Sequence, residues 1–174
     1  MLKVKALFFD VFGTVVDWRS GIVSAAEKIS KKNNISLKAA EFADAWRAEY
    51  QPAMEEIRIG KRDFTILDIL HMENLQKISS KFNLNNLSNE DNNFLVTAWH
   101  RLPGWPDSSE GLQKLKKKFI LATQSNGNIA LMVNMAKHSN LNWDVILGAE
   151  VLGYYKPHPE AYLRACKALN LDPS

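Results

Sequence analysis

Three polar clusters in the sequence could together carry out chemistry on a small anion. The first spans residues 10–14, the second spans residues 123–128, and the third is Lys156 with its neighbours. Asp10 could attack an electrophilic carbon or pair with a cation, and Lys156 could be that cation. A turn such as Ser125–Gly127 can bind an anion through free backbone N–H groups. Each cluster alone is equally typical of a structural ion pair, a helix cap or a simple turn.

An alternation of strands and helices predicts how these clusters meet. Short apolar runs predict buried strands at residues 4–10, 119–123 and 145–147, and helical spacing predicts helices at residues 109–117, 130–138 and 159–169. This order favours an α/β fold with a Rossmann-like, doubly wound parallel sheet and right-handed crossovers. Ligands of such sheets bind outside the carboxyl ends of the strands, where all three clusters fall.

The segment between the first two strands has a different texture. Apolar residues recur there at helical spacing, and the three clearest stripes predict three to five helices: Ile22, Ala25, Ala26 and Ile29; Ala39, Phe42, Ala43, Trp46 and Tyr50; Phe64, Leu67 and Leu70. A turn-rich stretch at residues 102–107 follows. We therefore expect a helical cap domain at residues 17–102, inserted into an α/β core made of residues 1–16 and 103–174.

Composition excludes several classes of protein. The 174 residues are 46% hydrophobic and 24% charged, which is typical of a globular domain, and the single cysteine, Cys166, allows no internal disulfide. No apolar run is long enough to cross a bilayer, and residues 1–10 make a poor signal peptide, so we expect a cytoplasmic protein without a membrane partner. The net charge is +3, and the lysine run at 116–118 lacks the interleaved aromatic residues of a nucleic-acid surface.

The three clusters resemble the ordered motifs of the haloacid dehalogenase superfamily. Residues 8–17, Phe-Phe-Asp-Val-Phe-Gly-Thr-Val-Val-Asp, are similar to its first motif; Ser125–Gly127 are similar to its second, and Tyr155–Pro157 to its third. The order and spacing agree over essentially the whole chain. The resemblance implies that Asp10 is a nucleophile and that the helical insert is the family's cap.

One position distinguishes branches of this superfamily. Its phosphatases carry a second aspartate two residues after the nucleophile, whereas this chain has Phe12, which cannot transfer a proton. An aromatic residue there resembles the type II L-2-haloacid dehalogenases, and Trp46-Arg47 resembles their cap-helix pair, whose arginine receives the halide. A helix-surface ion pair is the alternative for Arg47. Tyr162, six residues after Lys156, matches the family's active-site tyrosine or simply packs.

The resemblance implies conversion of (S)-2-haloacids to (R)-2-hydroxyacids through an ester of Asp10, with Arg47 stabilising the departing halide and Lys156 the carboxylate. The substrate carboxylate is expected to be held by backbone N–H groups near Phe12, Gly13 and Asn126. The Ser125 hydroxyl is expected to hold it too. Thr14 and Ser125 would orient Asp10 and Lys156. The expected partners are the 2-haloacid and the halide, with no cofactor and no metal, and the cap surface could form a homodimer.

The chain ends at Ser174, before the place where the family has a fourth core strand and a fourth motif. We therefore expect either a fragment of a longer gene product or an incomplete gene model, in which the strand carrying Asp10 is an open sheet edge. Two other functions stay open. One is a phosphatase or phosphotransferase of the same superfamily, and the other is a truncated domain that binds a small anion or a partner without catalysis.

Overall fold

The computed structural model describes residues 4–173, so the outer ends of the expected core, residues 1–3 and 174, lie outside the described residues. Strands β1 (Ala6–Phe9) and β2 (Ile120–Thr123) pair in parallel, with Ala6 opposite Ile120 and Phe9 opposite Thr123. Within the described residues, β1 pairs with no strand other than β2. The chain thus has the small parallel sheet of an α/β fold, and one side of β1 is unpaired there.

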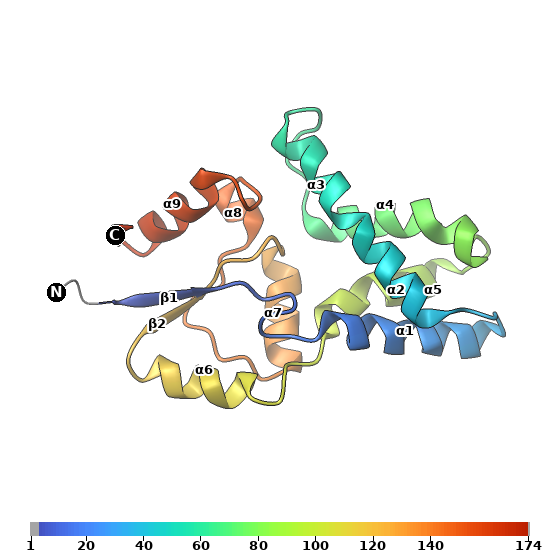
Figure 1. The fold of residues 1–174 in the computed structure, drawn as a ribbon, viewed down its shortest axis with the longest axis horizontal. Helices are drawn as coiled ribbons and strands as arrows, with labels where there is room; N and C mark the ends of the chain where they lie inside the picture. Colours follow the sequence, from blue (N-terminus) through green and yellow to red (C-terminus); the bar gives the residue numbers. More distant parts are fainter. Residues whose placement is uncertain (1–3, 174) are drawn as a thin grey trace.

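Helices cover both faces of this sheet (Figure 1). Leu121 packs in one apolar cluster with residues of α6 (Ser108–Lys116) and α7 (Ile129–His138). The next residue, Ala122, packs in a second cluster with α8 (Ala149–Leu152) and α9 (Pro159–Ala168). Successive side chains of a strand point to opposite faces, which explains why the strands are apolar throughout.

The predicted third strand is only partly formed. Val145 makes one parallel bridge with Ala122, and the Thr123 amide donates to the Val145 carbonyl at 3.1 Å. At the next position the Leu147 amide donates to the Thr123 hydroxyl at 2.9 Å. This side-chain hydrogen bond takes the place of a backbone hydrogen bond between strands. The expectation of a strand over residues 145–147 was therefore wrong in extent. Helix α8, which follows, was not predicted.

Five α-helices form within residues 17–102, in agreement with the three to five expected: α1 (Trp18–Asn33), α2 (Ala39–Ala48), α3 (Tyr50–Arg58), α4 (Leu67–Ser79) and α5 (Asn89–Val96). Two 3₁₀ turns, η1 (Ser80–Phe82) and η2 (Thr97–Arg101), follow α4 and α5. This helical segment lies beside the α/β part in Figure 1. The Asp17 carboxylate caps its first helix by accepting from the Ser20 amide at 3.1 Å.

A buried apolar cluster joins the helical segment to the α/β part. Tyr50, Met54 and Leu70 of the helical segment pack there with Ala149 and Tyr155 of the α/β part. This packing fixes α3 and the start of α4 near the residues that precede Lys156. Burial of apolar surface stabilises such an interface, so we expect the two parts to stay in contact.

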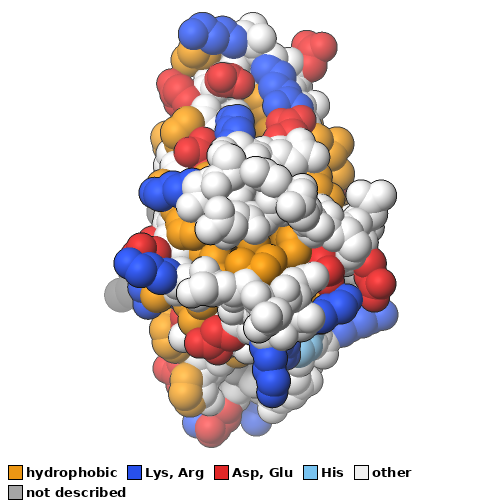
Figure 2. Space-filling view, turned by 90° about the vertical axis from the view of Figure 1, so that its right-hand side faces the viewer, with side chains coloured by type: hydrophobic (Ala, Val, Ile, Leu, Met, Phe, Trp, Pro, Cys, Tyr) orange, Lys and Arg blue, Asp and Glu red, His pale blue; other side chains and the backbone are white. Residues whose placement is uncertain are grey.

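The face at the far end of the helical segment is shown in Figure 2, where an apolar band crosses the middle between charged side chains of both signs. Among the helices of residues 4–173, none combines the length and the hydrophobicity that a membrane span requires.

Candidate active site

The end of β1 places Asp10 beside a cation and a hydroxyl. Lys156 Nζ lies 2.7 Å from Asp10 Oδ1, and the Thr14 hydroxyl donates to Asp10 Oδ2 at 2.9 Å. The side chain of Asp10 is 46% exposed, whereas that of Lys156 is 18% exposed. Asp10 is therefore less desolvated than its place after an apolar strand indicated, since one side of β1 is unpaired in the described residues.

The turn after Asp10 depends on a glycine. Gly13 has a φ of +91°, a conformation that side chains disfavour, and its amide donates to the Val16 carbonyl at 2.9 Å. This N–H group is thus already used, and the expectation that Gly13 would hold the substrate carboxylate through it is not supported by the geometry. Within residues 4–173, the amides of Phe12 and Asn126 have no such acceptor.

The loop after β2 positions Lys156. Asn126 Oδ1 accepts from the Lys156 amide at 2.8 Å, so the second predicted cluster is tied to the third. Ser125 is buried, and its hydroxyl accepts from the Gly127 amide at 3.2 Å rather than bonding to Asp10 or Lys156. A Cβ on Gly127 would lie 2.8 Å from the Met132 sulfur, so a larger residue in this turn would require the Met132 side chain to move.

Arg47 approaches the site from the end of α2. Its guanidinium lies 3.8 Å from the ring centroid of Tyr50 and 5.5 Å from that of Trp18, a cation–π arrangement. Within the described residues, no carboxylate lies within ion-pair distance of Arg47. The helix-surface ion pair, which was the alternative for this residue, does not form.

Tyr50 is a site residue that the sequence reasoning did not identify. Burial raises the pKa of its phenol, while the nearby Arg47 guanidinium and a hydrogen bond with Asn126 oppose that rise. The charge of Asp10 also acts on Tyr50, so both the arginine and the carboxylate lie within electrostatic range of this side chain. Its position only three residues after Arg47, across the junction of α2 and α3, was an available signal.

Of the two remaining predicted residues, Phe12 packs against the cluster that contains Tyr50, whereas Tyr162 stands apart. Phe12 packs edge-on against Trp99, with ring centroids 6.1 Å apart, and thus belongs to the aromatic wall between the helical segment and the α/β part. Tyr162 lies on α9 and is 44% exposed, and none of the hydrogen bonds among the described residues joins it to Asp10 or Lys156. A role for Tyr162 stays a prediction.

No group of three or more His, Cys, Asp or Glu side chains within residues 4–173 is arranged to hold a metal ion. The charges gathered at the site are one carboxylate and two cations, Lys156 and Arg47. An aspartate flanked by a lysine, with a free guanidinium nearby, can attack a carbon centre and receive an anionic leaving group.

Comparison with known proteins agrees with this arrangement. A family model described as haloacid dehalogenase-like hydrolase matches residues 4–174. The chain therefore belongs to the haloacid dehalogenase-like hydrolases. It is 28% identical to (S)-2-haloacid dehalogenase 4A of Burkholderia cepacia, over 99% of this chain and 72% of that protein. It is 29% identical to (S)-2-haloacid dehalogenase 1 of Pseudomonas sp. (strain CBS-3), over 100% of this chain and 74% of that protein.

Solved structures give the same result at higher identity. The chain superposes on the crystal structure of the defluorinating L-2-haloacid dehalogenase Rha0230 with a TM-score of 0.95 and 44% identity, covering 98% of this chain and 70% of that one. For the L-2-haloacid dehalogenase PA0810 the TM-score is 0.94 at 40% identity, covering 99% and 73% of the two chains. These similarities confirm the fold class and the family that the three motifs indicated.

Proposed function

We propose that this chain is a hydrolytic dehalogenase that converts (S)-2-haloacids to (R)-2-hydroxyacids. The observation that carries the proposal is the guanidinium of Arg47, which has no ion-pair partner among residues 4–173 and lies on the Tyr50 ring. Tyr50 also feels the charge of Asp10, which is itself paired with Lys156. A cation without a protein carboxylate is suited to an anionic leaving group, and the relatives at 28–44% identity are 2-haloacid dehalogenases by name.

The first step is displacement of the halide. One carboxylate oxygen of Asp10 attacks the carbon that bears the halogen, on the side opposite the halogen, so that a carbon–oxygen bond forms as the carbon–halogen bond breaks. The halide leaves with the bonding electron pair, and Arg47 stabilises the charge that develops on it. Lys156 and Thr14 hold the carboxylate in place for this attack.

The second step is hydrolysis of the resulting ester. Water attacks the carboxyl carbon of Asp10 and breaks its bond to the substrate oxygen, which takes a proton to become the hydroxyl of the product. The second proton of the water goes to solvent, and Asp10 is regenerated as a carboxylate. Because the carbon centre is displaced once, its configuration is inverted overall. The product is therefore the (R)-2-hydroxyacid.

The remaining residues of the site would hold the substrate. The amides of Phe12 and Asn126 support this role because they have no acceptor within the described residues, and the ring of Phe12 supplies an apolar wall. Phe12 also cannot act as the proton donor that a phosphate ester would need, so it favours a leaving group that departs unprotonated. In this proposal residues 17–102 form the cap domain and the α/β part forms the core.

Halide release from L-2-chloropropionate, measured with EDTA present, tests the proposal. We expect chloride and D-lactate in equal amounts, and no release from the D-enantiomer. A matched reaction with p-nitrophenyl phosphate and magnesium should release no phosphate. Phosphate release without chloride release would contradict the proposal. The chain spans 72–74% of the length of its curated relatives, so a version extended to their full length is measured in parallel.

Two further parts of the proposal concern assembly and location. A homodimer formed through the cap surface is tested by light scattering of the purified chain across a concentration series. A cytoplasmic location is tested by fractionation of the source cells. Neither result changes the chemistry above.

A further inference from the structure

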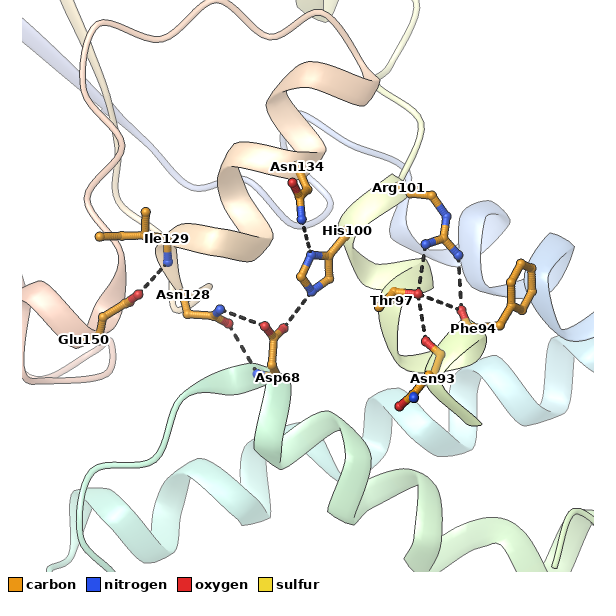
Figure 3. Close-up of polar contacts among 10 residues, drawn as sticks. All are labelled: Asp68, Asn93, Phe94, Thr97, His100, Arg101, Asn128, Ile129, Asn134 and Glu150. Carbon is orange, nitrogen blue, oxygen red and sulfur yellow. Dashed lines mark hydrogen bonds and ion pairs between the residues drawn. The ribbon is translucent and has the colours of Figure 1, made fainter. Parts of the chain in front are cut away.

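A polar network joins the helical segment to the α/β part away from the motif residues (Figure 3). Its centre is Asp68, in the first turn of α4, which bonds directly to Asn128, the N-cap residue of α7. Through His100 of η2 the network also reaches Asn134 of α7. All these contacts cross between segments far apart in the sequence, because Asp68 lies 60 residues from Asn128 and 32 from His100.

The contact between Asp68 and Asn128 is reciprocal. Asn128 Nδ2 donates to Asp68 Oδ2 at 2.9 Å, and the Asp68 amide donates to Asn128 Oδ1 at 3.3 Å. Asn128 is 2% exposed, so both ends of its side-chain amide are satisfied out of water by a single partner residue. This pairing fixes both the position and the orientation of the amide.

His100 bonds to the second carboxylate oxygen of Asp68 and links it to Asn134. Its Nε2 lies 2.9 Å from Asp68 Oδ1, and its Nδ1 lies 3.0 Å from Asn134 Nδ2. Since Asn134 Nδ2 can only donate, Nδ1 accepts and Nε2 carries the proton that it donates to Asp68. Burial disfavours the charged form of Asp68, but hydrogen bonds from His100 and Asn128 outweigh it and lower the pKa of this carboxyl.

This network is mechanically connected to both halves of the proposed active site. On one side, Asn128 follows two residues after Asn126, which holds the Lys156 amide at 2.8 Å. On the other, the Trp46 indole N–H donates to the His71 carbonyl of α4 at 3.0 Å, and Arg47 is the next residue. Asp68 and His71 lie on the same helix, so α4 connects Asn128 to Arg47.

We propose that Asp68 and Asn128 are positioning residues that set the distance and angle between Arg47 and the Asp10–Lys156 pair. They touch no reacting atom in this account; they hold α4 against the loop at residues 125–128. The kinetic consequence rests on the proposed dehalogenase function, whereas the structural link does not. Displacement at carbon requires in-line alignment of nucleophile and leaving group, so a small shift of Arg47 should lower the rate of chemistry more than substrate binding.

Exchanging the two side chains gives a specific test. Asn128→Asp alone places a second carboxylate against Asp68 and should separate α4 from the loop. The double variant Asp68→Asn with Asn128→Asp restores every contact, because Asn at 68 can donate to Asp at 128 and still accept from His100. Asp44→Asn is the matched control, since Asp44 pairs with Arg19 within the helical segment, at 2.8 Å, and does not reach the α/β part.

Two readouts are measured on the chain and on its extended version. For Asn128→Asp we expect kcat for chloride release to fall on the order of 100-fold with little change in KM, and the double variant to recover most of it. Amide hydrogen exchange should rise at residues 66–72 and 125–129 in the single variant and return to normal in the double variant. Asp44→Asn should change neither readout at these segments.

The outcomes separate this inference from the proposed function. Exchange that rises and is rescued, in a protein that releases no halide, would support the link between α4 and the loop and reject the dehalogenase. Halide release that is unchanged in folded Asn128→Asp, or a loss that the double variant does not rescue, would overturn the positioning role. If Asn128→Asp does not fold, Asp68→Asn alone takes its place. It should give a smaller loss that adding Asn128→Asp reverses, and an unchanged rate would likewise overturn the role.

Discussion

Asp10 and Arg47, two of the three charged groups at the proposed site, have contrasting surroundings. Asp10, at the end of β1, is 46% exposed and already bonded to Lys156 and Thr14. Arg47, at the end of α2, lies on aromatic faces and has no ion-pair partner among residues 4–173. The carboxylate is therefore neutralised and oriented by the protein, whereas the guanidinium is oriented but left with its charge available.

This difference assigns the two groups to different tasks. A nucleophile needs a fixed direction, which the lysine and threonine contacts provide, and it must stay accessible to the substrate. A group that receives an anion needs a free positive charge, and aromatic faces can hold a guanidinium without neutralising it. An arginine that proves dispensable would contradict the role given to Arg47. An aspartate that does not become modified would contradict the role given to Asp10.

Removal of the nucleophile should have the largest effect. Asp10→Asn keeps the shape of the side chain but removes the attacking oxygen anion, so we expect kcat for chloride release to fall on the order of 10⁴-fold or more. The measurement is chloride release by ion chromatography, with circular dichroism to confirm folding. Thr14→Val should give a smaller loss, because it removes only one of the two contacts that orient the carboxylate. A folded Asp10→Asn protein with normal activity would end the proposed mechanism.

Substitution of the arginine should have the next largest effect. Arg47→Met removes the charge, and we expect kcat/KM to fall roughly 100- to 1,000-fold, because a donor aimed at developing charge contributes about 3–4 kcal/mol. Arg101→Met is the matched control, since Arg101 also lies over an aromatic ring, 5.2 Å from the Phe94 centroid, but outside the site. Equal losses in the two variants would show that the comparison between Asp10 and Arg47 is mistaken.

Acid should weaken the helical segment through His71. This side chain is 2% exposed, and burial lowers its pKa to about 3. Because its pKa in the unfolded chain is about 6.5, acid protonates the unfolded state first, so stability present above about pH 6.5 is lost as the pH falls toward 3.

This linkage predicts a loss of about 2 kcal/mol in the free energy of unfolding between pH 7 and pH 5. Urea denaturation at the two pH values measures it. His71→Phe should show a smaller loss over the same range, whereas the exposed His138→Gln should behave like the parent chain. An equal loss in the parent chain and His71→Phe would mean that other groups carry the acid sensitivity.

The smallest predicted effect concerns the hydroxyl of Tyr50. Tyr50→Phe keeps the ring that lies 3.8 Å from the Arg47 guanidinium and removes only the phenol oxygen, so we expect a decrease of about 3- to 10-fold in kcat/KM, as for one neutral hydrogen bond. Tyr50→Leu also removes the ring and should cost more. If the two substitutions have the same effect, the ring does not hold the arginine.

Much of the fold was predictable because local patterns carry it. Continuous apolar runs identified β1 and β2, and three stripes at helical spacing marked α1, α2 and α4, three of the five helices of residues 17–102. The third strand was predicted too long, because the Thr123 hydroxyl takes a ladder position that the apolar pattern cannot reveal. Helix α8 was missed because its four residues are too few to show a period.

The site was predictable only in part, for a related reason. Asp10, Thr14 and Lys156 belong to motifs whose order along the chain marks them, and the structure brings these three together. Asp68 and His100 belong to no motif, and they meet only because α4 and η2 fold against α7. Gly13 is marked by its motif, but the motif does not reveal that the turn itself uses the N–H group of this residue.

The proposed mechanism requires a covalent ester on Asp10, which mass spectrometry of a single turnover can detect. The enzyme is used in excess over L-2-chloropropionate in oxygen-18 water. Because water attacks the carboxyl carbon of Asp10 in the proposed mechanism, we expect one heavy oxygen in the peptide that contains Asp10 and none in the lactate. If hydrolysis is slow, the same peptide should instead carry the propionate ester. Heavy oxygen in the lactate, with an unlabelled peptide, would show that water attacks the substrate directly and would contradict the account.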